Sequence, residues 1–422
     1  MAIKHFVSID DLNQEEMEAV FSLAERIVDS DIENVGFVLD FILRFLSEQE
    51  EPFGGQMKGA SCAGKIMGVA FYEPSTRTRL SFESAMHRLG GSVIGFADAA
   101  VSSVSKGESL ADTIKVISSY CDILVIRHPV EGSARWASEN SQVPVINAGD
   151  GAHEHPTQTL LDLFTLRQEK GKLEGLKVGL LGDLKYGRTV HSLSRALVRA
   201  GAQVALISPL SLRMPEAILS RLRKENAGAV SEGNSLEEFL PKLDALYVTR
   251  IQRERFSDPR EYERVKGTYV VDARTMKKAN RNTLVLHPLP RVGEIAPSFD
   301  SDPRAGYFRQ VAYGVPVRMA LVALLVAAST NDEEREQTAL AEAIHPKGLE
   351  CPNARCITHV ERDIKPRFAK EPLTGKIVCS YCDEPAPVSG RDIKAAGAGR
   401  EVAKDNSRKG GKQIARTRTS KS

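Results

Sequence analysis

The sequence is poor in the features that mark membrane, exported or disordered proteins. Its longest purely apolar run, residues 319–328, is about half the roughly 20 residues of a membrane-spanning helix. The first residues, MAIKHFVSIDD, have neither the apolar core of a signal peptide nor the pattern of a transit peptide. We therefore expect a cytoplasmic protein with no membrane partner. Hydrophobic residues make up 42% of the chain and charged residues 27%, which excludes a wholly disordered protein.

Net charge is also small, but only as a total. The 57 Lys and Arg residues against 55 Asp and Glu residues give +2. Residues 391–422 carry ten Lys or Arg and three Asp or Glu, a net +7, which leaves −5 for the rest of the chain. This segment has no aromatic residue and no leucine, so we expect residues 386–422 to form a disordered basic tail. A solubilising tail is favoured, and nucleic-acid binding is the alternative.

Hydrophobic patterning predicts an α/β protein with two doubly wound parallel-sheet domains. Compact apolar runs separated by helical stretches indicate parallel strands joined by crossover helices. The expected strands are residues 65–71, 92–96, 122–127 and 143–147, then 177–181, 203–207, 245–248, 269–271 and 283–286. The expected helices include residues 110–120, 187–199 and 315–328.

Four of the six cysteines predict a metal site in a small C-terminal β module, residues 351–385. Cys351 and Cys356 form one close pair, and Cys379 and Cys382 form another. Four thiolates in two short turns are typical of structural Zn²⁺, with no open position for catalysis. Two disulfides or a redox pair are the alternatives, which a reducing cytosol disfavours. Cys62 and Cys121 are expected to be ordinary buried thiols.

A cluster of hydroxyl and guanidinium groups follows the first predicted strand. Ser75, Thr76, Arg77 and Thr78 lead directly into a predicted helix. Helix N-terminal N–H groups with hydroxyls and arginines alongside form a site for phosphate or a similar dianion. A simple Ser/Thr helix cap with solvated arginines is the alternative, but one cap needs only one hydroxyl.

Further polar residues follow other predicted strands, where α/β proteins bind ligands. His155 and Gln158 could polarise a carbonyl and hold an amide, and Arg127 adds a cation. Candidate carboxylate clamps in the second half are Arg188, Arg250 and Gln252. Pro288 and Leu289 lie in an extended loop whose carbonyls could accept hydrogen bonds from an amine. The glycines at 179, 182 and 187 do not fit a dinucleotide-binding motif.

Taken together, these motifs resemble the signatures of the aspartate/ornithine carbamoyltransferase family. Ser75-Thr-Arg-Thr-Arg79, His155-Pro-Thr-Gln158 and His287-Pro-Leu-Pro290 carry the resemblance, and Asp183-Leu-Lys-Tyr-Gly-Arg188 makes it closest to the aspartate branch. Residues 345–385 are similar to the zinc domain of that enzyme's regulatory chain. The resemblance implies transfer of the carbamoyl group of carbamoyl phosphate to L-aspartate, an early step of de novo pyrimidine biosynthesis, with no cofactor in the chemical step.

The resemblance also implies a role for each residue. Carbamoyl phosphate would be bound by Ser75, Thr76, Arg77, Thr78, Arg127, His155 and Gln158, with Thr78, Arg127 and His155 polarising its carbonyl. Aspartate would be bound by Arg188, Arg250, Gln252, Pro288 and Leu289. Ser102 and Lys106 match a loop that reaches into the site of a neighbouring subunit, where both would bind carbamoyl phosphate and Lys106 would also bind aspartate. We therefore expect a homotrimer with shared sites, and a higher assembly of trimers is compatible with this.

The implied organisation has five parts. Residues 1–155 with a return helix at 310–330 would bind carbamoyl phosphate, residues 156–309 would bind aspartate, and residues 331–350 would link them to the zinc module at 351–385 and the tail. The link is too short for the nucleotide-binding effector domain of the regulatory chain, so we expect no nucleotide control of the usual kind. The ornithine branch of the family is the alternative to the aspartate branch. It typically has a cysteine in the motif that reads His287-Pro-Leu-Pro290 here, and a cationic substrate would bind poorly beside Arg188 and Arg250. Aspartate is therefore favoured over ornithine.

Overall fold

The computed structural model describes residues 4–29, 62–251, 253, 256, 258–329, 349–361 and 364–387. Three predictions lie outside these residues: those for Gln252, for linker residues 331–348 and for the tail beyond residue 387.

The first half of the described chain forms a four-stranded parallel sheet in the order β2-β1-β3-β4. Its strands are β1 (Ile66–Phe71), β2 (Ser92–Phe96), β3 (Ile123–His128) and β4 (Val145–Asp150). The crossover helices are α3 (Thr76–Arg88), α4 (Leu110–Ser118) and α5 (Ser133–Asn140), and α1 (Gln14–Asp29) precedes the sheet. β1 and β4 are almost wholly buried because helices cover both faces, whereas β2 is a partly exposed edge strand.

The second half forms a five-stranded parallel sheet in the order β7-β6-β5-β8-β9. Its strands are β5 (Lys177–Leu181), β6 (Gln203–Ile207), β7 (Val230–Gly233), β8 (Ala245–Val248) and β9 (Leu284–Leu286). Its helices are α7 (Arg188–Arg199), α8 (Glu216–Asn226), α9 (Leu236–Phe239) and α10 (Pro259–Val265). The strand predicted at 269–271 is wrong, because only Val271 forms an isolated bridge, to Ile295. β7 was not predicted.

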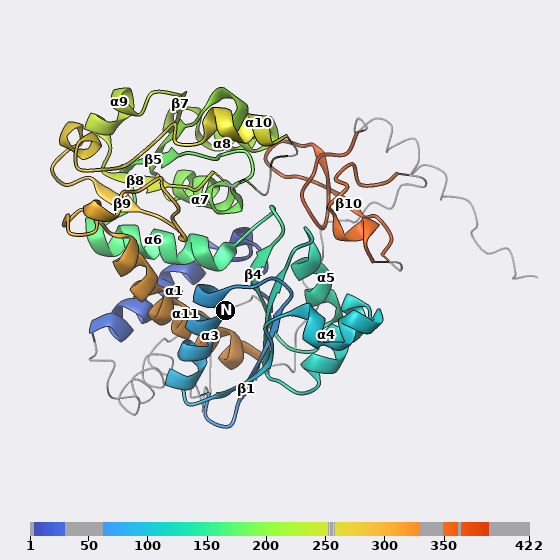
Figure 1. Ribbon diagram of the computed structural model, residues 1–422. Coiled ribbons are helices and arrows are strands. Elements are labelled where there is room, and N and C mark those ends of the chain that lie inside the picture. The colour runs from blue at the N-terminus through green and yellow to red at the C-terminus, as the bar shows by residue number, and fades with distance from the viewer. Residues whose placement is uncertain are drawn as a thin grey trace, which may run out of the picture.

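Two helices connect the lobes (Figure 1). α6 (Pro156–Lys170) leads from the first sheet to the second, and α11 (Tyr307–Ser329) returns from the second to pack against α1, α3 and α6. One hydrophobic core runs through both lobes along these helices. α11 is long and apolar enough to cross a membrane, yet 78% of its apolar window is buried inside the protein, as in the core helix of a folded domain.

The order of strands predicts where ligands bind. In the first sheet β1 lies between β2 and β3, and in the second β5 lies between β6 and β8. The crossovers that leave the adjacent strands β1 and β3 run in opposite directions, as do those that leave β5 and β8, and this opens a crevice at the carboxyl ends of each pair. Ser75–Thr78, Arg127, Arg188 and Arg250 lie at or just beyond the carboxyl ends of β1, β3, β5 and β8, so both crevices carry the predicted cationic residues.

The C-terminal module contains the antiparallel pair β10 (Phe368–Lys370) and β11 (Ile377–Cys379). It lies beside α4 and α5, near the region where the two lobes meet (Figure 1). Its cysteines, Phe368 and Tyr381 share a hydrophobic cluster with apolar residues of β3, α4 and α5. The module is therefore packed onto the first lobe as part of one folded unit.

Candidate active site and metal centre

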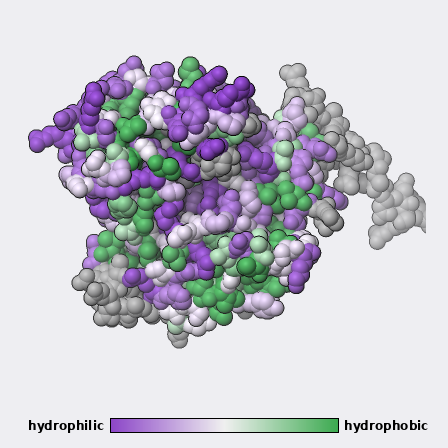
Figure 2. Space-filling model, in the orientation of Figure 1, coloured by the Kyte–Doolittle hydropathy of each residue, from purple (hydrophilic) through white to green (hydrophobic). Residues whose placement is uncertain are grey.

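A cavity of about 400 Å³ lies between the two lobes, where the carboxyl ends of both sheets face each other. Figure 2 shows a hydrophilic hollow between the lobes. The structure brings most of the predicted site residues together in its wall. They are Ser75, Thr76, Arg77, Thr78, Arg127, His155, Gln158, Arg188, Arg250, Pro288 and Leu289.

The N-terminus of α3 forms one wall of the cavity. Ser75 is the N-cap residue, but its side chain makes no capping hydrogen bond, so the simple-cap interpretation does not describe this hydroxyl. The first N–H groups of a helix have no partner within the helix, and its dipole favours an anion there. Thr78 is buried on the same turn, and partial burial lowers the pKa of Arg77. The turn therefore brings N–H, hydroxyl and guanidinium donors together, an arrangement that can bind a small anion.

Arg127 and Arg188 meet in the cavity from different lobes. Arg127 Nη1 donates to the Ala148 carbonyl at 3.1 Å, and Arg188 Nη1 donates to the Gly151 carbonyl at 2.6 Å. Glu73 pairs with both guanidinium groups, at 3.4 Å from Arg127 Nε and 3.8 Å from Arg188 Nη2. Gly149, with φ +118°, permits this approach, since a Cβ there would lie 3.0 Å from Arg188 Cζ.

His155 is a buried residue held as a neutral imidazole. It is the N-cap residue of α6, with Pro156 in the first helical turn, and its side chain is free of any capping role. Burial, reinforced by the charges of Arg188, Arg127 and Arg318, holds the pKa of His155 well below its usual value. A neutral imidazole can donate one hydrogen bond to a carbonyl oxygen without bringing another positive charge into the cavity.

Gln158 is oriented by a buried carboxylate one helical turn away. Gln158 Nε2 donates to Asp162 Oδ1 at 2.8 Å, which leaves its carbonyl oxygen as an acceptor for an amide N–H. Asp162 also accepts from Tyr247 Oη at 2.8 Å and from Gln310 Nε2 at 2.5 Å. Asp162 therefore connects α6, β8 and α11 behind the cavity. Burial raises the pKa of Asp162 to about 7.

Hydrogen bonds of the buried Asp183 hold the loop after β5 in place. Asp183 is fully buried, and its Oδ1 accepts the N–H groups of Lys185 at 3.1 Å and Tyr186 at 2.9 Å. The Asp183 N–H donates to Thr249 Oγ1 at 2.9 Å. These bonds tie the loop that begins α7 at Arg188 to the loop that carries Arg250. The second lobe thus presents two guanidinium groups from adjacent strand ends.

Two predicted residues lie away from this cavity. Ser102 lies between two consecutive 3-10 turns, Ala99–Val101 and Ser103–Lys106, Lys106 ends the second, and neither residue lines the cavity. Ser102 Oγ donates to the Ala99 carbonyl at 2.8 Å, and Lys106 is exposed. Gln252 lies outside the described residues.

Sequence reasoning did not single out Asp162, Gln310 or Arg318. Arg318 lines the cavity with 3% of its surface exposed, and its Nη1 donates to Ser81 Oγ at 2.9 Å. Burial lowers the pKa of Arg318 to about 10. The signals were present: Arg318 is a lone charge in an apolar helical stretch, and Asp162 follows Gln158 by four residues on one helix face.

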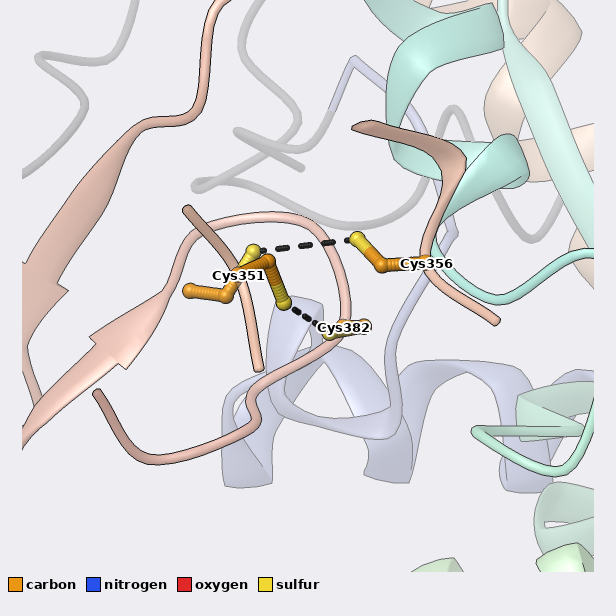
Figure 3. A group of neighbouring side chains, drawn as sticks. Cys351, Cys356 and Cys382 are labelled. Atoms are coloured by element: carbon orange, nitrogen blue, oxygen red, sulfur yellow. Dashed lines mark hydrogen bonds between the residues drawn. The ribbon is translucent and has the colours of Figure 1, made fainter. Parts of the chain in front are cut away.

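The four module cysteines converge on one point. The Cys351 and Cys382 sulfurs are 3.5 Å apart and those of Cys356 and Cys379 are 3.9 Å apart, with all four within 4.8 Å of one another. Figure 3 shows Cys351, Cys356 and Cys382 turned toward this point. Sulfurs bound tetrahedrally at about 2.3 Å from one ion would be about 3.8 Å apart. The four are free, buried thiols rather than disulfides, so the donor set fits such an ion.

Both cysteine loops contact loops that border the cavity. The Glu131 N–H donates to the Arg355 carbonyl at 3.1 Å, and the Ile357 N–H donates to the Glu131 carbonyl at 2.8 Å. Glu131 lies four residues after Arg127. On the other side, Asp383 pairs with His153 Nε2 at 3.2 Å, two residues before His155. The module therefore supports the loops after β3 and β4 from outside.

Family models match almost the whole described chain. Residues 4–168 match the carbamoyl-P binding domain of aspartate/ornithine carbamoyltransferase, and residues 174–325 match its Asp/Orn binding domain. Residues 344–392 match the metal binding domain of the aspartate carbamoyltransferase regulatory chain.

Individual relatives agree with these models. The aspartate carbamoyltransferase catalytic subunit of Thermococcus onnurineus is 57% identical over 286 residues, which cover 68% of this chain and 92% of that protein. The corresponding subunit of Methanothermobacter thermautotrophicus is 54% identical over 299 residues, covering 71% of this chain and 95% of that protein.

Solved structures show the same fold. The catalytic subunit of M. jannaschii aspartate transcarbamoylase superposes with a TM-score of 0.65 at 46% identity, covering 79% of this chain and 100% of that chain. The Trypanosoma cruzi enzyme in complex with carbamoyl phosphate and aspartate has a TM-score of 0.64 at 37% identity, covering 76% and 94%. The chain belongs to the aspartate/ornithine carbamoyltransferase family and carries a regulatory-chain metal binding domain on the same polypeptide.

Proposed function

We propose that this chain transfers the carbamoyl group of carbamoyl phosphate to the amine of L-aspartate, giving N-carbamoyl-L-aspartate and phosphate, in the cytoplasm as an early step of de novo pyrimidine biosynthesis. One observation carries the proposal. A single cavity joins an anion-binding helix N-terminus from one lobe to paired guanidinium groups from the other. Such a cavity suits two anionic substrates bound side by side.

In the proposed reaction, Ser75, Thr76, Arg77 and Thr78 bind the phosphate group, and Arg127 lies between phosphate and carbonyl. Thr78, Arg127 and His155 donate to the carbonyl oxygen, and Gln158 accepts from the carbamoyl amide. The amine lone pair of aspartate forms the new C–N bond, and the C–O bond to phosphate breaks with its electron pair leaving on phosphate. The amine proton passes to the departing phosphate or to water. Fixed donors stabilise the negative charge that develops on the carbonyl oxygen.

For the second substrate, we assign the two carboxylates of aspartate to Arg188, Arg250 and Gln252. The backbone carbonyls of Pro288 and Leu289 accept hydrogen bonds from its amine. Ornithine is the alternative substrate, and the positive charges of Arg188, Arg250 and Arg318 in the cavity wall argue against its cationic side chain. The proposed function divides the chain into three working parts. Residues 1–155 and the return helix 310–330 bind carbamoyl phosphate, residues 156–309 bind aspartate, and residues 351–385 hold the metal.

A homotrimer with shared sites is part of the proposal. Lys106 is exposed and does not line the cavity between the lobes, and Val101, in the preceding turn, is 77% exposed. An exposed apolar residue next to an exposed lysine suits a loop that inserts into a neighbouring subunit, where Ser102 and Lys106 would complete the site. Mixing Lys106→Ala with Arg77→Ala subunits should then restore part of the activity, and no recovery after confirmed exchange would contradict sharing.

The metal is proposed to be a structural Zn²⁺ held by Cys351, Cys356, Cys379 and Cys382. Four buried thiolates fill a tetrahedral shell and leave no position for a substrate. We assign no part of the chemical step to the metal and no nucleic-acid partner to the chain.

A product assay tests the main proposal. The purified protein is incubated with carbamoyl phosphate and either aspartate or ornithine, and the carbamoylated product is identified by mass. Formation of N-carbamoyl-L-aspartate and absence of citrulline are expected. Failure with aspartate would overturn the assignment.

A further inference from the structure

The loop after β9 is held by an internal network whose central residue, His287, is buried in the wall of the cavity. Pro288 and Leu289 line the cavity, whereas Glu294, later in the same loop, lines a separate hollow of about 200 Å³. His287 links them: it is 1% exposed and contacts both the Leu289 backbone and the Glu294 carboxylate.

The hydrogen bonds define the protonation of His287. The Leu289 N–H donates to His287 Nδ1 at 2.7 Å. A backbone N–H can only donate, so Nδ1 is the acceptor and the ring proton is on Nε2. Nε2 lies 2.7 Å from Glu294 Oε1 and therefore donates to it. The carboxylate thus selects the tautomer that captures the Leu289 N–H.

The other end of the network is equally fixed. Glu294 Oε2 accepts the Val292 N–H at 3.1 Å and the Gly293 N–H at 3.0 Å. The His287 N–H donates to Gln310 Oε1 at 2.9 Å, and Gln310 also contacts Asp162. Both ends of the loop are therefore attached to buried groups, and the loop cannot shift without breaking several bonds.

Leu289 has an unusual backbone conformation, with φ +49°. A leucine adopts this left-handed region only where its surroundings hold it. The hydrogen bond from the Leu289 N–H to His287 Nδ1 stabilises this conformation. The same conformation sets the direction of the carbonyls on either side of the residue.

We propose that His287 and Glu294 are positioning residues that aim the Pro288 and Leu289 carbonyls at the substrate amine, and so determine recognition of an amine rather than of the dicarboxylate. This inference rests on the proposed function. Neither side chain needs to touch the substrate: Glu294 acts through His287, and His287 acts through the Leu289 backbone. Arg188 and Arg250, which we assign to the carboxylates, follow β5 and β8 and are not part of this loop.

Succinate separates these roles, because it has the carboxylates of aspartate but no amine. Steady-state kinetics with aspartate and competitive inhibition by succinate are measured for Glu294→Ala and Glu294→Gln. For Glu294→Ala we expect kcat/KM for aspartate to fall about tenfold or more, as for loss of hydrogen bonds to a charged group. Succinate inhibition and the KM for carbamoyl phosphate should stay within about twofold, since their ligands remain.

Conservative substitutions should retain part of the activity that the alanine variants lose. Glu294→Gln keeps an acceptor for His287 Nε2–H but loses the acceptor for the two backbone N–H groups, so an intermediate kcat/KM is expected. His287→Asn places a carbonyl oxygen where it can accept the Leu289 N–H two residues on, and should retain more activity than His287→Ala. Glu237→Gln, at an exposed pair with Lys278, is the matched control and should match the wild type.

Three results would overturn the inference. These are unchanged aspartate kinetics in Glu294→Ala, equal losses for aspartate and succinate, or no difference between His287→Asn and His287→Ala. If Glu294→Ala fails to fold, Glu294→Gln carries the same comparison, with thermal unfolding as the check on folding. A wild-type protein that makes no N-carbamoyl-L-aspartate would instead contradict the proposed function itself.

Discussion

At the scale of single residues, the cavity combines several guanidinium groups with the neutral imidazole of His155. Arg127, Arg188 and Arg318 surround His155, and their charges help to keep its imidazole neutral. A protonated His155 would add a further positive charge beside these guanidinium groups. The neutral imidazole is therefore the form compatible with the site. His155 can therefore serve as a hydrogen-bond donor at neutral pH without titrating near its ordinary pKa.

Replacing His155 with alanine should impair the chemical step more than binding. Loss of one preorganised donor to a developing oxyanion typically lowers kcat by about 10²–10³-fold. We expect a decrease of this size in steady-state kinetics, with KM for carbamoyl phosphate changed far less because the phosphate ligands remain. A variant with normal kcat would exclude His155 from carbonyl polarisation.

The depressed pKa of His155 also predicts a pH dependence of stability. An unfolded histidine takes up a proton near pH 6.5, whereas the folded protein holds His155 neutral. The folded state therefore has its full stability above pH 6.5 and loses stability as the pH falls below it. His155→Gln removes this contribution, so its thermal unfolding midpoint should fall less between pH 7 and pH 5 than that of the wild type. Equal decreases would contradict the assignment.

At the scale of elements, the strands with compact apolar runs were predictable and the polar edge strand was not. β5, β6 and β8 have the predicted bounds because their buried residues form uninterrupted apolar runs. β7 reads Val-Ser-Glu-Gly and has no buried residue at the sheet edge, so no local pattern marks it. Residues 269–271 are apolar but pair only through Val271, which local sequence cannot reveal.

The candidate site was predictable where its chemistry is local. Ser75–Thr78 and His155–Gln158 are short motifs next to strand ends, and the structure brings both to one cavity. The contacts that orient them are not local: Tyr247 and Gln310 reach Asp162 from distant elements. Likewise, the pairing of Glu131 with the Cys356 loop depends on how the module packs, which sequence spacing does not determine.

The packing of the module predicts an effect of metal removal on two distant loops. Chelation, or Cys351→Ser, should release the backbone bonds at Glu131 and the Asp383–His153 pair. We expect faster amide hydrogen exchange at residues 128–132 and 150–155 and a higher KM for carbamoyl phosphate. Cys121→Ser, at a half-buried thiol outside the cluster, is the control and should retain the metal. Unchanged exchange in the metal-free protein would contradict this coupling.

At the scale of the whole molecule, the distance along the chain between the matched domains is informative. The Asp/Orn binding match ends at residue 325 and the metal binding match begins at 344. The intervening stretch is much shorter than a domain. ATP or CTP added to the product assay should therefore cause no saturable change in rate at subsaturating aspartate. Strong saturable inhibition competitive with neither substrate would overturn this expectation.

Covalent attachment keeps the metal module on the catalytic lobe when the protein is diluted. Where a module and its catalytic chain are separate polypeptides, their contact depends on the concentration of each. Here the contacts at Glu131 and His153 form within one chain, so the module meets its surface at an effective concentration that does not depend on the amount of protein in solution. Its support of the catalytic loops is thus insensitive to how much protein the cell makes.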